Sequence, residues 1–442
     1  MTAPTIDRRR HDREILALAV PAFGALVAEP LFLLADSAIV GHLGTSQLAG
    51  VGVASAALTT ATGVFVFLAY ATTAAVARRI GAGDRRAAVQ QGIDGIWLAL
   101  ALSVVVVALT LLLAPWTADL LGASATAAPY AVTYLRISAL GIPAMLMVMA
   151  ATGVLRGLQD TRTPLLVAVA GFAANLGLNA GLVYGAGLGV AGSAWGTVLA
   201  QTGMAAAYLF VVVRGARRER ASLRPDAAGI RACARAGGPL MVRTLSLRAI
   251  LMIATAVAAG LGDDAIAAHQ IALTVFLFIA FALDAIAIAG QAIIGRHLGA
   301  EDVPGAKAAT RRMIEWGVGS GVVLGLLVVT ARPLYVPLFT PDPVVQGQLN
   351  TVLLLLALCQ PVSGLVFVLD GVLMGAGDGP YLAWAMLATL AVFAPVALAV
   401  PASGTGLAGL WWAMNLFMLV RAGFLAKRAR SGKWLVTGAV RA

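Results

Sequence analysis

The chain has 442 residues, of which 60% are hydrophobic and only 12% are charged. A soluble globular protein carries about 25% charged residues, so this composition excludes a protein whose whole surface faces water. The net charge of +11 is compatible with nucleic-acid binding, but the basic residues lie in short segments between apolar runs rather than on one soluble module. We therefore expect a lipid bilayer as the surroundings and no nucleic-acid partner.

Apolar runs of membrane-spanning length, about 20 residues, recur from one end of the chain to the other. Breaks rich in glycine, proline or charge separate them. The pattern predicts twelve membrane-spanning helices, near residues 15–40, 47–77, 90–114, 128–155, 163–185, 189–213, 236–260, 266–295, 312–331, 346–374, 380–402 and 405–426.

Lysine and arginine gather in alternate breaks. Arginines are frequent near residues 78–86 and 214–235, whereas the breaks at 41–46 and 260–264 contain neither lysine nor arginine. Arg332 is an exception to the alternation. Because cytoplasmic loops carry the positive excess, we expect a multi-pass protein of the cytoplasmic (inner) membrane with both termini in the cytoplasm.

The two halves of the chain repeat each other. A constant offset of 218 residues pairs Pro21 with Pro239 and Arg78 with Arg296, and it still holds far downstream. Each repeat contains six predicted spans, an even number, so both halves begin on the same side of the membrane. Parallel repeats of this kind are a transporter architecture. The same offset also pairs Asp84 with Asp302, Gly157 with Gly375, and Asp160 with Asp378.

This repeat predicts an all-α integral membrane protein with two parallel six-helix lobes. The expected organisation is a cytoplasmic tail (1–14), an N-terminal lobe (15–213), a basic cytoplasmic connector (214–235), a C-terminal lobe (236–428) and a cytoplasmic tail (429–442). The acids Asp84, Asp160, Asp302 and Asp378 lie beside glycines at the cytoplasmic ends of spans, where we expect them to cap helices or fix turns.

The first predicted span contains two acids and two prolines. Glu29 and Asp36 are seven residues apart, about two helical turns, so they share a helix face. Pro21 and Pro30 each remove a backbone hydrogen bond and can bend the helix. A carboxylate inside a membrane marks a functional site by default. We expect Asp36 to take up and release a proton, with Glu29 as a second candidate; the alternative is a structural carboxylate held by hydrogen bonds.

The repeat also shows where the halves differ. At the offset of 218, Asp36 corresponds to Ala254, and Asn175 and Asn179 correspond to apolar residues. The two asparagines are four residues apart and share a helix face. Buried amides in a membrane need hydrogen-bond partners, which Asp36 or Glu29 would supply.

Further polar residues in the spans are candidates for a substrate cleft. Asp284 and Asp370 are suited to attracting a cationic substrate or moving a proton, but they are equally suited to pairing with the intramembrane arginines Arg136, Arg243 or Arg248. Met145 belongs to a methionine cluster that is suited to an adaptable pocket or to ordinary packing. Gln291, seven residues after Asp284, is the remaining cleft candidate.

Several functional classes lack support in the sequence. No Walker-type GxxxxGK[ST] motif is present, so direct ATP drive is not encoded. The four histidines lack the spacing of metal ligands, and no catalytic constellation is visible. We expect neither an enzyme nor a cofactor or bound metal. A receptor or scaffold would not explain a duplicated six-helix unit in which only one of the two halves carries the acid of the first span.

Several segments together resemble the multidrug and toxic compound extrusion (MATE) transporters, and most of all their DNA-damage-inducible F (DinF) branch. The resemblance covers residues 15–428. Its carriers are ADSAIVGHLG (35–44), RRIGAGD (78–84), YLRI (134–137), VLRGLQDTRTP (154–164), NLGLNAGLVYG (175–185), GVAGSAWGTVLAQ (189–201), LDAIAIAGQAIIGRHLGA (283–300) and LDGVLMGAGD (369–378).

The resemblance implies twelve helices in two lobes, a central cleft, a monomer, and export driven by an inward proton or sodium gradient. It places the coupling acid at Asp36 and the helix bend at Pro21. Its polar partners fall on Glu29, Asn175, Asn179 and Thr197. The family often has Asp where this chain has Asn179, and Gln where it has Glu29, which weakens the expectation of a sodium site like that of those members.

These observations predict a secondary active antiporter that exports amphipathic, cationic drugs or toxic metabolites in exchange for protons. A sodium-coupled exporter and a flippase for lipid-linked precursors are the alternatives. A flippase would need a strongly cationic cleft, for which only Arg136, Arg243 and Arg248 are available.

Overall fold

The computed structural model describes residues 3–440, without the side chains of residues 3–7, 29 and 33–35. Over that range no strand is assigned. Among the described residues, eleven helices are long and apolar enough to cross a membrane, and a bent helix pair makes twelve spans when it is counted as one. The prediction of an all-α membrane protein with twelve spans is confirmed.

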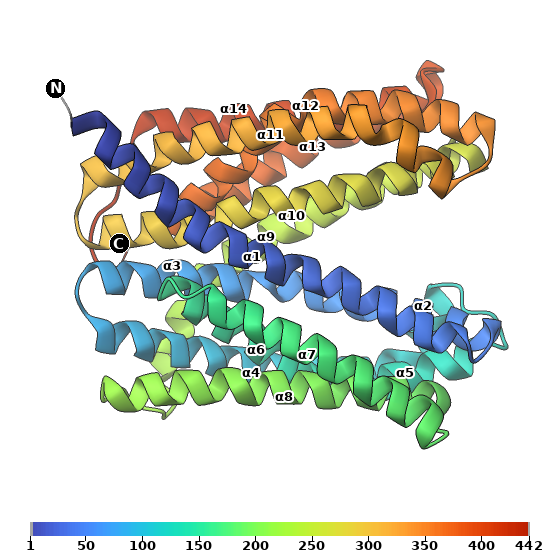
Figure 1. Cartoon of the computed structure of the whole chain (residues 1–442), viewed down its shortest axis with the longest axis horizontal. Helices are drawn as coiled ribbons and strands as arrows, with labels where there is room; N and C mark the ends of the chain where they lie inside the picture. The colour runs from blue at the N-terminus through green and yellow to red at the C-terminus, as the bar shows by residue number, and fades with distance from the viewer. Residues whose placement is uncertain (1–2, 441–442) are drawn as a thin grey trace. The chain divides into compact units, whose positions relative to one another are not determined.

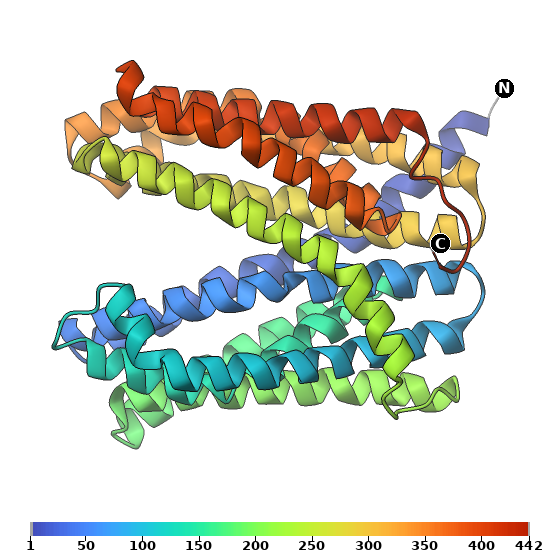
Figure 2. The same cartoon turned by 180° about the vertical axis from the view of Figure 1, so that it is seen from behind.

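The chain forms two compact units (Figures 1 and 2). We call Gly24–Gly237 the N-terminal unit, and Met1–Phe23 together with Gly238–Ala442 the C-terminal unit. Two long helices, α1 (Ala3–Gly41) and α9 (Ala227–Gly260), contribute residues to both units.

In the N-terminal unit, α3 packs against α4 and α6, α7 packs against α8, and α2 packs against α5. The axes of α5 and α6 differ by 52°, and Gly141 and Pro143 lie at the break, where proline cannot donate a backbone hydrogen bond. The elements are α2 (Thr45–Gly63), η1 (Val64–Val66), α3 (Phe67–Gly81), α4 (Arg85–Leu120), α5 (Ala128–Ala139), α6 (Ile142–Gly157), α7 (Arg162–Ala180), η2 (Gly181–Gly185) and α8 (Gly189–Arg218).

In the C-terminal unit, α12 packs against α10, α11 and α14, and α13 packs against α14. Figure 2 shows α13 and α14 side by side in red. Close approach depends on glycine, because a methyl group at Gly371 of α12 would clash with the Ala287 carbonyl oxygen of α10. The elements are α10 (Asp263–Gly299), α11 (Val303–Phe339), α12 (Pro343–Gly375), α13 (Gly379–Ser403) and α14 (Gly406–Ser431).

Helix α1 is continuous through both of its prolines, and the boundary between the units falls after Phe23, two residues beyond Pro21. Ion pairs hold its first turns in the C-terminal unit. Asp12 Oδ1 lies 2.6 Å from Nε of Arg312 on α11, and Glu14 Oε1 lies 2.5 Å from NH2 of Arg296 on α10. The first part of α1 is thus tied to one unit, and its later part belongs to the other.

The four acids beside glycines at the ends of spans mostly cap helices, as expected. Oδ1 of Asp84 accepts from the Ala87 amide and Oδ1 of Asp302 accepts from the Gly305 amide, each at 2.8 Å. The Gly305 amide, aided by the hydrogen bond from His297, holds the pKa of Asp302 below its usual range. Asp160 accepts from two amides at the start of α7, whereas Asp378 pairs with the Arg428 guanidinium at 2.6 Å.

The basic stretch at 214–235 is mostly helical. Helix α8 extends to Arg218 and α9 begins at Ala227, which leaves residues 219–226 between them. Beyond α14, the indole of Trp434 is buried and the Gly438 amide donates to the Leu298 carbonyl at 3.0 Å. The end of the described chain therefore packs on the C-terminal unit.

Candidate functional site

The N-terminal unit surrounds one buried carboxylate, Asp36 of α1, with neutral hydrogen-bond donors. Oδ1 of Asp36 accepts from Nδ2 of Asn179 and from Oγ of Ser193, each at 2.6 Å. Oδ2 accepts from the Tyr134 hydroxyl at 3.1 Å. Only 3% of Asp36 is exposed. Three helices from distant parts of the sequence, α5, α7 and α8, therefore converge on one acid of α1.

A chain of amides extends this network. Nδ2 of Asn179 also donates to Oδ1 of Asn175 at 3.2 Å, and Nδ2 of Asn175 donates to Oγ1 of Thr197 at 3.2 Å. Both asparagines are buried, as their helix face predicts. Oδ1 of Asn179 is buried and has no hydrogen-bond donor among the described residues. The network thus retains one unused oxygen acceptor beside the carboxylate.

Close helix packing fixes the position of Asn179. A methyl group at Gly196 of α8 would clash with Oδ1 of Asn179. Immediately after α7, the chain forms the single π-helical turn η2, and the Tyr184 hydroxyl in this turn donates to the Ile39 carbonyl of α1 at 2.6 Å. Such π turns are often found at functional sites. Here the turn ties the end of α7 to α1, three residues beyond Asp36.

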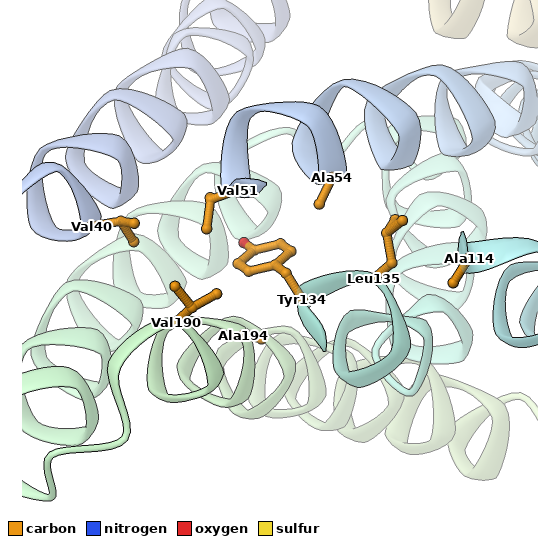
Figure 3. Packing of buried hydrophobic residues seen from close by; sticks show 8 residues of the cluster. All are labelled: Val40, Val51, Ala54, Ala114, Tyr134, Leu135, Val190 and Ala194. Atoms are coloured by element: carbon orange, nitrogen blue, oxygen red, sulfur yellow. The ribbon is translucent and has the colours of Figure 1, made fainter. Parts of the chain in front are cut away.

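An apolar layer encloses the hydroxyl side of the site. Figure 3 shows Tyr134 projecting from α5 between Val51 of α2 and Val190 of α8. Val40 of α1, one turn beyond Asp36, belongs to the same buried cluster. The tyrosine ring is thereby held in one orientation, with its hydroxyl directed at the carboxylate.

The site can serve both protonation states of Asp36. As a carboxylate, Asp36 accepts three hydrogen bonds; once protonated, it must donate one. The hydroxyls of Ser193 and Tyr134 can rotate from donor to acceptor, whereas the amide NH2 of Asn179 cannot. No cationic side chain among the described residues pairs with Asp36. Taking up or releasing a proton therefore does not require breaking an ion pair.

The structure brings together four of the residues proposed from the sequence, Asp36, Asn175, Asn179 and Thr197, and adds two that were missed. Ser193 lies four residues before Thr197, so the helical period could have placed both on one face of α8. Tyr134 lies in the YLRI segment, but its isolated position gave no spacing signal. The side chain of Glu29 lies outside the described residues.

The cleft candidates are distributed over both units. In the N-terminal unit, Met145 of α6 receives a contact from Nε2 of Gln201 to its sulfur at 4.0 Å. In the C-terminal unit, Asp284 of α10 is half-buried, and Nε2 of Gln291 contacts the Met374 sulfur at 4.0 Å. Asp370 of α12 pairs with two arginines, one of which, Arg243, was among the partners considered from the sequence.

Comparison with known proteins shows to which family this architecture belongs. The MatE family model matches residues 21–180 and 239–399, one segment in each repeat. The chain is 31% identical to Protein DETOXIFICATION 45, chloroplastic, of Arabidopsis thaliana over 96% of this chain and 79% of that protein. It is 29% identical to DNA damage-inducible protein F of Escherichia coli over 96% and 94% of the two chains.

Solved structures agree in fold. The Vibrio cholerae MATE transporter VcmN in the bent form superposes with a TM-score of 0.88, at 22% identity, over 97% of this chain and 99% of that one. The family model covers most of the chain and both of its halves. The chain therefore belongs to the MatE family, the multidrug and toxic compound extrusion transporters.

Proposed function

We propose that this protein is a secondary active antiporter that exports amphipathic small molecules in exchange for protons, with Asp36 as the coupling acid. The observation that carries this proposal is a buried carboxylate held by neutral donors alone. Intramembrane acids are costly and mark ion pathways. A carboxylate without a cationic partner can change its charge without leaving an unpaired charge behind.

Protonation of Asp36 is proposed to drive the conformational change through α1. A neutral Asp36 attracts the donors of Asn179, Ser193 and Tyr134 less strongly, because charge-assisted hydrogen bonds are roughly twice as strong as neutral ones. Pro21 and Pro30 are the proposed bending points, and Pro21 lies two residues before the boundary between the units. Asn175 and Thr197 hold the amide of Asn179 in place.

Sodium coupling is the second candidate, and Asn179 provides the observation that favours it. Its unpartnered Oδ1 is a hard oxygen ligand beside Asp36, and hard cations prefer oxygen ligands. The site nevertheless has a single described carboxylate, which makes a proton the simpler coupling ion.

We propose the preference for cationic substrates on fewer acidic residues than the sequence indicated. Asp370 pairs with two arginines, so its charge is not available to a cation. Attraction of cations therefore depends on the remaining candidate acids, Asp36, Glu29 and Asp284. We further propose a monomer in the cytoplasmic membrane, with both termini in the cytoplasm, where the arginine-rich breaks lie.

Transport by purified protein in lipid vesicles tests the coupling ion. Vesicles receive either a pH gradient or a sodium gradient of the same size. The accumulation of a panel of dyes, antibiotics and bile-salt-like anions inside the vesicles is then followed. Proton antiport predicts that the pH gradient alone drives accumulation. Accumulation driven only by sodium would replace proton coupling by the second candidate, and no accumulation under either gradient would contradict antiport.

A further inference from the structure

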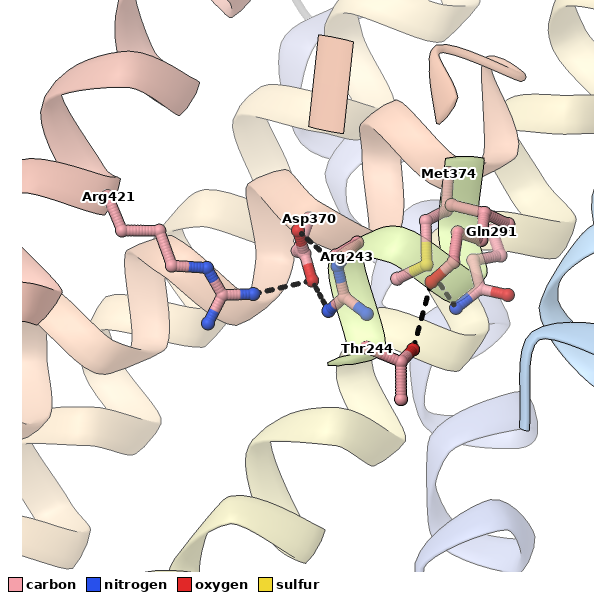
Figure 4. Close-up of polar contacts among 7 residues, drawn as sticks. Arg243, Thr244, Gln291, Asp370, Met374 and Arg421 are labelled. Atoms are coloured by element: carbon pink, nitrogen blue, oxygen red, sulfur yellow. Dashed lines mark hydrogen bonds and ion pairs between the residues drawn. The ribbon is translucent and has the colours of Figure 1, made fainter. Parts of the chain in front are cut away.

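The C-terminal unit contains a buried cluster of two arginines around one aspartate. NH2 of Arg421 on α14 lies 2.7 Å from Oδ2 of Asp370 on α12. Arg243 on α9 contacts both oxygens of the same carboxylate, with Nε 3.4 Å from Oδ1 and NH2 bound to Oδ2 (Figure 4). The three side chains, from three different helices, are at most 9% exposed.

The charges of the three clustered side chains do not balance. A guanidinium remains protonated in proteins, so the cluster of Arg243, Asp370 and Arg421 carries one surplus positive charge, and the two guanidiniums repel each other. Asp284 on α10 is half-buried and attracts Arg421. Arg248, five residues beyond Arg243 on α9, adds a further positive charge and has no ion-pair partner in the described part of the unit. These five side chains, three arginines and two aspartates, together carry one surplus positive charge.

The cluster also retains hydrogen-bonding capacity that its own members do not use. Nε of Arg421 is buried and has no acceptor among the described residues. Guanidinium presents its donors as a planar fork that matches a carboxylate bidentately, and Asp370 engages only the NH2 group of Arg421. The Nε–H group of Arg421 is therefore a buried donor that is available to a second oxyanion.

A purely structural role would need only one of the two arginines. One arginine neutralises Asp370, whereas a second buried guanidinium adds a desolvation penalty of its own. An anion that binds beside Arg421 would offset this penalty by restoring charge balance. The surplus is thus explained if the region meets a negative group during transport.

We propose that the Arg243–Asp370–Arg421 cluster binds the carboxylate of an anionic or zwitterionic amphipathic substrate, with the unused Nε–H of Arg421 as the main contact. This inference depends on the proposed export function, which it extends to substrates that carry a negative group. Because the cluster is nearly closed, the carboxylate reaches Arg421 in a conformation in which α9 or α14 has shifted, as alternating access requires.

Equilibrium binding of two matched dyes tests the assignment. Rhodamine B carries a free carboxylate, and its ethyl ester is the same molecule with that carboxylate masked. Fluorescence anisotropy is measured with the full chain in nanodiscs of neutral lipid, without any ion gradient. The wild-type protein is expected to bind rhodamine B at least about tenfold more tightly than the ester, because a charge-assisted hydrogen bond contributes about 1.5–3 kcal/mol.

Neutralising a positive and then a negative member of the cluster separates a binding role from a structural one. Arg421→Gln removes the surplus charge and is expected to abolish the preference for rhodamine B. Asp370→Asn increases the surplus positive charge, and we expect the preference for rhodamine B to be kept or to become larger. A structural ion pair would instead make both substitutions equally damaging. Arg430→Gln, on the exposed last turn of the same helix, is the matched control and is expected to behave as wild type.

Three results would overturn the proposal: equal affinity of the wild-type protein for both dyes, binding of neither dye, or a preference that persists in Arg421→Gln. If Arg421→Gln does not fold, Arg421→Lys, which keeps the charge but not the fork, must weaken the preference. Nanodiscs of anionic lipid test the other source of an oxyanion, a lipid phosphate. If anionic lipid competes with the dye in the wild-type protein but not in Arg421→Gln, the cluster binds a lipid phosphate and the substrate assignment is contradicted. Because no gradient is applied, failure here leaves proton antiport intact.

Discussion

The side-chain nitrogen Nδ2 of Asn179 lies 2.6 Å from Oδ1 of Asp36, although the two residues are 143 positions apart in the chain. The same nitrogen also donates to Asn175, four residues earlier on α7. Asn179 therefore connects the carboxylate of α1 to the rest of the polar network, and its loss should be felt at Asp36.

Asn179→Ala should lower the rate of pH-driven transport by at least about tenfold, because it removes a charge-assisted hydrogen bond of about 1.5–3 kcal/mol. The rate is measured in vesicles with an imposed pH gradient. Asn415→Ala is the control, since Asn415 is also buried but donates to the Leu355 carbonyl in the C-terminal unit. Equal rates in Asn179→Ala and wild type would show that the contact is not used in coupling.

The two hydroxyls at Asp36 should differ in importance. Ser193 donates at 2.6 Å and Tyr134 at 3.1 Å, so Ser193→Ala should shift the pH profile of transport further than Tyr134→Phe. Both changes leave the apolar packing nearly unchanged, and the thermal midpoint should therefore move little. The pH dependence of the initial rate is the measurement, and a larger effect of Tyr134→Phe would reverse the proposed order.

Helix packing at Gly196 offers a third prediction. A methyl group there would clash with Oδ1 of Asn179, whereas a methyl group at Gly203, two turns along the same helix, would meet nothing within 4 Å. Gly196→Ala should therefore lower both transport and the thermal midpoint, and Gly203→Ala should leave both unchanged or raise the midpoint slightly, because alanine favours helix. Equal midpoints for the two variants would contradict the close approach of α7 and α8.

The sequence predicted the helices well because membrane spans depend on local composition. The 218-residue offset and the asparagines at positions 175 and 179 likewise follow from spacing alone. Tyr134 was missed because a single polar residue in α5 gives no periodic signal. Ser193 shares a face of α8 with Thr197, but its role depends on which helices meet α1, and that is not visible in the sequence. Arg421 was missed for the same reason: it is one arginine in an apolar span, and its meaning appears only when α9, α12 and α14 pack together.

The cap at the start of α11 should make stability depend on pH. Because the pKa of Asp302 is lowered in the folded protein, its contribution is present above the ordinary carboxyl pKa of about 3.9 and is lost as the pH falls through the folded value. Asp302→Ala should cost about 1 kcal/mol at pH 7, and the difference from wild type should shrink below about pH 4. Thermal melts in detergent at pH 7 and pH 3 check this, with Glu301→Ala as the exposed neighbouring control; a difference that grows toward low pH would be the wrong sign.

Asp36→Asn is the decisive variant for proton coupling, because it keeps the size of the side chain and removes its ability to change charge. The measurement is the initial rate of substrate accumulation in vesicles with an imposed pH gradient, alongside a melting curve that shows the variant is folded. We expect a folded protein whose transport no longer responds to the pH gradient. A folded Asp36→Asn protein that transports at the wild-type, gradient-dependent rate would rule out Asp36 as the coupling acid.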